Sequence, residues 1–315
     1  MKLGLLTDAL GEYGLEELLE IAGKAGFEAL EISCGNWSKR CRAPHIHVEQ
    51  LLESTEQCEK YLSALKSYGL EISALNCSGN QLAPGKEGEI HREVVKNTIR
   101  LAGRLHVETI VMMSGLPGGG AGDAYPSWVT MSWPPVCKEI LDYQWNEVVI
   151  PYWQWLADYA LAHGVKRIAL ENYANNVVYN VRSLLKLRAA VGDIIGMNLD
   201  PSHLLWMGGD PIAAVKALAR EGALYYVHAK DMRREENIFG VNGCCDPTDN
   251  SKYARRAWNY VTVGYGQEEG WWKKFIAVLK LTGYDGVISL EHEDVSMGAL
   301  EGVRKAAGVL KRCIY

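Results

Sequence analysis

Short apolar runs alternate with longer stretches of helical periodicity from one end of the chain to the other. In the first pair, an apolar run at 2–7 precedes a segment whose residues Leu15, Leu18, Leu19 and Ala22 recur at the spacing of one helical face. The pattern predicts strands at 2–7, 29–33, 71–76, 109–114, 167–171, 195–200, 224–228 and 287–291. It predicts helices at 15–25, 56–68, within 89–105, from about Pro151 to His163, and at 180–191, 210–220, 270–282 and 296–312.

This order amounts to eight strand–helix units in succession. Repeated alternation of this kind favours parallel strands joined by right-handed crossovers. Eight units spread over 315 residues fit a closed barrel better than an open sheet. With no linker-like stretch to divide the chain, the sequence predicts a single-domain (β/α)8 TIM barrel covering residues 1–315.

Two predicted connections are unusually long, at 115–143 and 229–268. Loops of this length without structure of their own are usually functional, so we expect both to fold over the mouth of the barrel as lids. The alternative is that they form a homo-oligomer interface. Tryptophans at or near such loops could stack on a sugar or simply pack the loops; they are Trp37, Trp128, Trp133, Trp206, Trp258, Trp271 and Trp272.

Composition narrows the class of partner. The chain has 33 Lys and Arg against 38 Asp and Glu, a net charge of −5, which argues against a uniformly basic nucleic-acid or membrane surface. No apolar run approaches the roughly 20 residues of a membrane span. Asp8 interrupts the first apolar run too early for a signal peptide. We therefore expect a cytoplasmic protein with a small-molecule substrate, no nucleic-acid partner and no membrane partner.

Four consecutive strands in the second half end in a residue that can bind a metal ion: Glu171, Asp200, His228 and Glu291. The carboxyl ends of barrel strands converge on one mouth, which would bring these side chains together. One acid at a strand end is usually a helix cap or a solvated turn residue, but four in succession are hard to explain in that way. Three carboxylates and one imidazole suit a divalent cation, Mn²⁺ first, with Mg²⁺ or Co²⁺ as alternatives.

The segments around these residues resemble the xylose isomerase-like TIM-barrel superfamily, within it the sugar phosphate isomerases/epimerases. The motifs are Leu-Glu-Asn at 170–172, Asn-Leu-Asp-Pro-Ser-His-Leu at 198–204, Val-His-Ala-Lys-Asp at 227–231 and Ser-Leu-Glu-His-Glu-Asp at 289–294, with Asn-Cys-Ser-Gly-Asn at 76–80 and Thr-Val-Gly-Tyr-Gly at 262–266 in support. The resemblance implies that the four strand-end residues bind the metal and that Glu171 and Glu291 also act as acid/base groups. As substrate contacts we expect Asn76, His203, Trp206, Lys230 and Arg255.

Such a site permits three reactions. A divalent cation bound to sugar oxygens acidifies the C–H beside a carbonyl and stabilises an enediolate, while a glutamate takes the proton. Return of the proton gives epimerisation or aldose–ketose isomerisation, which we expect here. Elimination from a 3-oxo sugar is the alternative, as in C-glycoside-deglycosidase subunits. An apurinic-site endonuclease of the same superfamily is a distant alternative, because it would need more histidines and a basic face. We expect a homo-oligomer; the alternative is a complex with a second, different subunit.

Overall fold

The structure of the chain is a computed structural model that describes residues 1–35 and 43–314. The predicted rim residue Trp37 lies outside the described residues.

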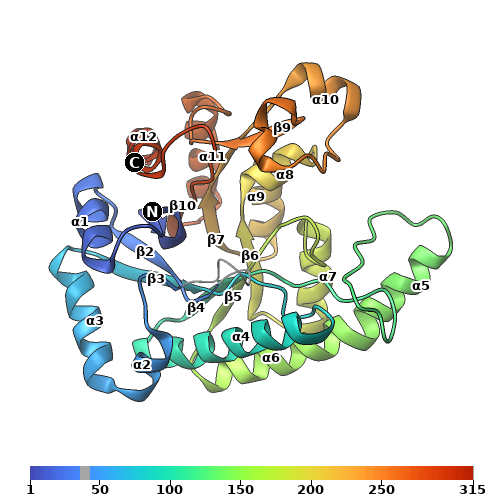
Figure 1. Ribbon diagram of the computed structural model, residues 1–315, viewed down its shortest axis with the longest axis horizontal. Coiled ribbons are helices and arrows are strands. Elements are labelled where there is room, and N and C mark those ends of the chain that lie inside the picture. Colours follow the sequence, from blue (N-terminus) through green and yellow to red (C-terminus); the bar gives the residue numbers. More distant parts are fainter. Residues whose placement is uncertain (36–42, 315) are drawn as a thin grey trace. The chain divides into compact units, whose positions relative to one another are not determined.

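The eight predicted strands form a closed parallel barrel, so the fold class inferred from the sequence is confirmed (Figure 1). The strands are β1 (Lys2–Leu6), β2 (Ala29–Ser33), β3 (Glu71–Asn76), β4 (Thr109–Met112), β5 (Arg167–Glu171), β6 (Ile195–Leu199), β7 (Leu224–Ala229) and β10 (Val287–Leu290). Their order around the barrel is β1-β10-β7-β6-β5-β4-β3-β2. In β2 and β6 every residue is buried, as expected of parallel strands that are covered on both faces.

The described residues contain each of the helices that the apolar spacing predicted, together with four short ones that it did not predict. They are α1 (Leu15–Ala25), α2 (Val48–Glu53), α3 (Thr55–Ser67), α4 (Gly85–Leu105), α5 (Val136–Tyr143), α6 (Ile150–Ala162), α7 (Val181–Val191), α8 (Pro201–Trp206), α9 (Pro211–Arg220), α10 (Glu236–Asn242), α11 (Glu269–Leu281) and α12 (Ala299–Cys313). Helix α1 illustrates the principle, because it buries Leu18, Leu19 and Ala22 and ends at the left-handed Gly26. Helix α11 packs against both α9 and α12, and Figure 1 shows it between them.

By its internal contacts the chain groups into two compact units. Unit 1 comprises Met1–Ile32, Ala64–Ser73 and Leu199–Tyr315, and unit 2 comprises Ser33–Ser63 and Ala74–Asn198. Each has a core of its own, which includes Trp272 and Phe275 in unit 1 and Trp153 in unit 2, all fully buried. The sequence-based boundaries of one domain, residues 1–315, stay a prediction.

The expectation that the two long connections lack regular structure was wrong. The last part of 115–143 is helix α5, which runs through a π-helical turn (Gln144–Val149) into α6. Pro151 occupies the first turn of α6, as the sequence predicted, directly after the π-helical turn. The prolines and tryptophans before α5 obscured the helical spacing in the sequence. The lid and interface roles of this segment stay predictions.

The second connection contains an antiparallel hairpin. Strand β8 (Asp231–Arg234) pairs with β9 (Trp258–Val261), and α10 and a 3-10 segment (Asn250–Arg255) lie between them. The sequence did not predict this hairpin. Strand β8 is mostly charged and contains no apolar run, so nothing in the sequence marked it as the strand that pairs with β9. In the part of the chain that the structure describes, no helix is long and apolar enough to cross a membrane.

Candidate metal centre

Unit 1 places three of the four predicted ligands at the carboxyl ends of neighbouring strands. His228 lies in β7, and Asp200 and Glu291 immediately follow β6 and β10. Asp200 also caps α8, because its Oδ1 accepts the backbone N–H of Ser202 at 2.8 Å. Asp200 and His228 are fully buried, and the side chain of Glu291 is 14% exposed. Oδ1 of Asp200 therefore caps the helix, as the capping interpretation expects, and Oδ2 takes no part in the cap.

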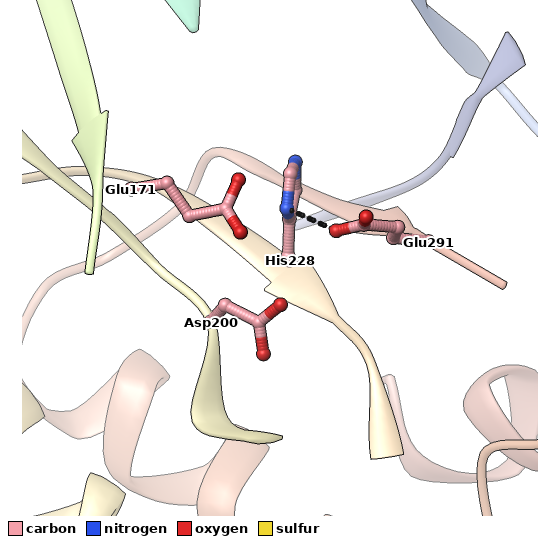
Figure 2. A group of neighbouring side chains, drawn as sticks. All are labelled: Glu171, Asp200, His228 and Glu291. Atoms are coloured by element: carbon pink, nitrogen blue, oxygen red, sulfur yellow. Dashed lines mark ion pairs between the residues drawn. The ribbon is translucent and has the colours of Figure 1, made fainter. Parts of the chain in front are cut away.

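The side chains of Asp200, His228 and Glu291 converge in Figure 2, where a dashed line joins Nδ1 of His228 to Oε2 of Glu291 at 2.9 Å. Glu171, the last residue of β5 in unit 2, is buried. Within unit 1, one ligand atom from each of Asp200, His228 and Glu291 lies within 4.8 Å of the others. The four predicted ligands together offer three carboxylate groups and one imidazole, which are donors that a divalent cation takes.

Neighbouring side chains lower the pKa of two of these carboxyl groups, Asp200 and Glu291. Burial alone would raise the pKa of Asp200, but His203 and Lys230 outweigh it and hold that pKa below its usual range. Burial likewise opposes the ionisation of Glu291, yet Lys230 and His228 lower the pKa of this carboxyl strongly. At neutral pH both groups are therefore anionic, which is the state that binds a cation.

Lys230 supplies much of this compensation. It is 3% exposed, and its Nζ lies 2.8 Å from Oε1 of Glu291 and 2.9 Å from Oε2 of Glu293. Burial acts to lower its pKa, but the two glutamates and further acidic neighbours raise it well above the usual value. The ammonium group also lies 4.4 Å from the ring centroid of Tyr260. The predicted substrate contact at 230 is thus a buried cation beside the predicted metal ligands Asp200 and Glu291.

An aromatic wall of His203, Trp206, Trp258 and Tyr260 borders the site. Nε2 of His203 lies 3.2 Å from Oδ2 of Asp200, and its Nδ1 lies 2.9 Å from the hydroxyl of Tyr260. Trp206 and Trp258 stack with centroids 4.7 Å apart. Two predicted substrate contacts, His203 and Trp206, thus pack against side chains of β9, a strand that the sequence did not predict.

The other predicted contacts have different surroundings. Arg255 is exposed at the end of the 3-10 segment, whereas Arg256 is buried over the ring of Trp258 at 4.6 Å. Asn76 is buried at the end of β3 in unit 2, and its Oδ1 accepts the backbone N–H of Ser78 at 3.0 Å. These substrate roles stay predictions.

Trp271 and Trp272 are not on a rim loop, because both lie in α11. Trp272 is fully buried, and its indole N–H donates to Asp231. The prediction placed them near the rim because it began this helix at residue 270, directly after the long connection. Packing against the barrel explains these two rings without a ligand.

Sequence reasoning missed one charged residue of the site, Glu31 in β2. Its carboxylate lies 2.9 Å from Nε2 of His228 and accepts a hydrogen bond from Oγ of Ser289 at 2.7 Å. All three side chains are fully buried. The available signal was an acid inside an otherwise apolar strand, which must find a partner when both faces of the strand are covered.

Unit 2 contains a cavity of about 320 Å³ lined by the segments that follow β4 and β5 and by α7. Apolar walls come from Leu116, Trp128 and Trp145, among others. Lys186 reaches over Trp145, with its Nζ 3.9 Å from the ring centroid, and burial lowers the pKa of this lysine. The cavity can accommodate a flat apolar group, and it belongs to the loops at the strand ends of unit 2, where Glu171 also lies.

Comparison with known families agrees with this geometry. The family described as xylose isomerase-like TIM barrel matches residues 19–313. The chain belongs to this family. It is 48% identical to the uncharacterized protein YfiH of Bacillus subtilis (strain 168) over 316 residues, covering 100% of this chain and 99% of that protein.

Solved structures share the fold at low sequence identity. The probable 3-DHS dehydratase AsbF of Bacillus anthracis, involved in petrobactin synthesis, matches with a TM-score of 0.67 at 18% identity, covering 99% of each chain. D-psicose 3-epimerase of Clostridium cellulolyticum H10, solved with D-tagatose, matches with a TM-score of 0.62 at 14% identity, covering 99% of this chain and 98% of that one. Likenesses at this level establish the fold and leave the reaction to the residues of the site.

Proposed function

We propose that this protein is a divalent-metal-dependent sugar isomerase or epimerase. The observation that carries the proposal is the gathering of ligand atoms of Asp200, His228 and Glu291 within 4.8 Å of one another in unit 1, largely out of solvent; the proposal adds Glu171, the buried acid that ends β5, as the fourth ligand. Several carboxylates confined in this way repel one another unless a cation compensates them. The donor set fits Mn²⁺, with Mg²⁺ and Co²⁺ as alternatives.

When bound, the cation would polarise a sugar carbonyl and acidify the adjacent C–H. We assign proton abstraction in unit 1 to Glu291, which Lys230 and His228 keep ionised and therefore able to accept a proton; the same two neighbours make it a weak base, so the C–H would have to be acidified by the cation. Lys230 and His203 are placed to bind sugar hydroxyls next to the ligands. Glu171 would hold the second proton, returned either to the opposite face of the same carbon or to the neighbouring carbon. The first outcome is epimerisation and the second is aldose–ketose isomerisation.

Metal analysis tests the site directly. The purified chain should hold about one divalent ion, and Asp200→Ala should lose it. Asp210→Ala is a matched control, because Asp210 also precedes a proline and caps a helix, accepting the N–H of Ile212 at 2.9 Å. Both variants lose a cap worth about 1 kcal/mol. Full occupancy in Asp200→Ala, or equal loss in Asp210→Ala, would contradict the assignment.

Exchange of carbon-bound hydrogen tests the chemistry. Incubation in D₂O with D-tagatose, D-psicose and a panel of aldoses, followed by NMR, should show deuterium beside the carbonyl of the true substrate class. Glu171→Gln and Glu291→Gln each keep an oxygen ligand but cannot hold a proton at neutral pH. Exchange should therefore fall by a factor of about 10² or more while the metal is retained. Wild-type exchange rates in either variant would remove that residue from the acid/base pair.

Elimination from a 3-oxo glycoside is the second candidate, favoured by the apolar cavity of unit 2. In this reaction a glutamate removes the proton at C2, the C1 substituent leaves with its bonding electron pair, and a C1=C2 double bond remains beside the C3 ketone. The cavity, with Lys186 over Trp145, would take a flat aglycone. The 4-nitrophenyl 3-oxo-glucoside distinguishes the two candidates, because only elimination releases coloured nitrophenolate.

A further inference from the structure

We propose that Glu31 is a positioning residue for the metal centre: it binds Nε2–H of His228 and thereby fixes Nδ1 as the atom that faces Glu291 and binds the cation. The inference rests on the proposed metal site and adds a residue that is not among its four ligands. It concerns contacts within unit 1 only.

Barrel topology shows that the contact between Glu31 and His228 crosses the interior. Strands β1 and β10 lie between β2 and β7 in the strand order, so these two side chains meet inside the barrel and not across one ladder. Oε2 and Oε1 of Glu31 lie 2.9 and 3.2 Å from Nε2 of His228. Ser289 stands opposite His228 in the β7–β10 register and donates to the same carboxylate at 2.7 Å. Two elements thus hold Glu31 in place.

The layer next to this contact is also tied across the barrel. Tyr226 precedes His228 by two residues in β7 and therefore points to the same face. Its hydroxyl lies 2.7 Å from Oγ of Ser73, in β3. This bond ties β7 to β3 on the side of His228 away from the strand ends.

A neutral imidazole has one N–H and one lone pair, and the partner of the N–H decides which nitrogen can bind a metal. Both carboxyl oxygens of Glu31 face Nε2 of His228 and act as acceptors there, so they select the tautomer with the proton on Nε2. Nδ1 pairs with Oε2 of Glu291 at 2.9 Å, and a cation bound here would displace the Nδ1 proton of that pair and take the lone pair, while Nε2 keeps its proton toward Glu31. A carboxylate behind a metal-binding histidine also makes the imidazole a more basic ligand.

Substitution at position 31 should therefore weaken metal binding without removing a ligand. Glu31→Met removes the acceptor and should lower the Mn²⁺ affinity, measured by calorimetry on the EDTA-stripped protein, by about 10- to 100-fold. Glu31→Gln keeps a neutral acceptor oxygen and should lie between wild type and Glu31→Met, and it serves as the test if the methionine variant does not fold. Ser289→Ala keeps the pair with His228 and should stay within about threefold of wild type.

NMR of ¹⁵N-histidine-labelled protein loaded with diamagnetic Zn²⁺ supplies a readout that a purely structural role would not change. Wild type should show Nε2–H of His228 with Nδ1 bound to metal, and Glu31→Met should lose this single tautomer. Unchanged Mn²⁺ affinity in folded Glu31→Gln and Glu31→Met would overturn the inference. So would a loss of affinity with the tautomer unchanged, because Glu31 would then act as a ligand. If wild type binds none of Mn²⁺, Co²⁺, Mg²⁺ and Zn²⁺, the metal site itself is refuted.

Discussion

Replacing Lys230 with methionine tests whether this buried cation stabilises the carboxylates around it. Methionine keeps most of the apolar stem and removes the ammonium group, which is 2.8 Å from Glu291 and 2.9 Å from Glu293. Glu293 is 53% exposed and can return to water, whereas the Glu291 side chain is 14% exposed and cannot. Removing one partner of a buried pair costs about 3–5 kcal/mol, and the exposed second acid places this case at the lower end, about 3 kcal/mol.

Urea unfolding in EDTA measures this cost, which should also appear as a fall in Tm of about 6 °C for a chain of this size. Lys166→Met is the matched control, because the Lys166–Glu108 pair has side chains 66% and 52% exposed and should contribute less than about 1 kcal/mol. Salt at 1 M should abolish the small effect at 166 and leave the effect at 230.

Saturating Mn²⁺ should reduce the cost of Lys230→Met, because a bound cation compensates Glu291 in place of the lysine. By linkage, the variant should also bind Mn²⁺ more tightly than wild type does. The gain in binding free energy should equal the free energy by which Mn²⁺ reduces the loss of stability. If the free energies of unfolding of Lys230→Met and Lys166→Met in EDTA differ by less than 1 kcal/mol, Lys230 does not compensate the charge of Glu291. Equal losses with and without Mn²⁺ would show that lysine and cation do not share the same carboxylate.

Three further substitutions test the support of the centre. Gly266→Ala should destabilise the protein by about 2 kcal/mol or more in thermal melts, because the new Cβ would stand 2.1 Å from a backbone carbonyl oxygen of β8. Gly270→Ala in α11 is the control. Its Cβ would meet nothing within 4 Å, so this variant should be neutral or stabilising in the same melts. Asp231→Ala leaves four backbone N–H groups and one indole N–H without their acceptor. It should lower the free energy of unfolding in urea by about 3 kcal/mol and speed amide hydrogen exchange in the loop after β9. Exchange as slow as in wild type would contradict this. Tyr226→Phe removes the bond to Ser73 and should cost about 1 kcal/mol in a urea titration, and a variant as stable as wild type would show that this cross-barrel bond adds nothing.

The barrel and its four strand-end residues were predictable because they depend on a local pattern. An apolar run that ends in an acid or histidine marks both the strand and the direction in which it ends, and parallel closure brings those ends to one mouth. Asp200 shows the principle: the residue that directly follows β6 also caps the next helix. Neither feature requires knowledge of distant contacts.

Glu31 and the β8–β9 hairpin could not be predicted in the same way. Glu31 gains its meaning from His228 and Ser289, which lie far away in sequence, and the local pattern shows only a charge inside an apolar strand. Strand β8 reads as polar because Asp231 turns inward to backbone N–H groups. In both cases the partners of a buried polar group are set by tertiary structure, which the spacing of apolar residues does not encode.

The contact between Glu31 and His228 joins residues separated by 197 positions, which has a consequence for synthesis of the chain. While β2 emerges from the ribosome, the carboxyl group of Glu31 has neither the imidazole nor the serine hydroxyl that will later donate hydrogen bonds to it. Strand β2 therefore cannot settle in its final surroundings until β7 and β10 have been made and the first and last thirds of the barrel have met. Folding of unit 1 should be postponed to the end of translation, and capture of a cation at Asp200, His228 and Glu291 would report that the barrel has closed.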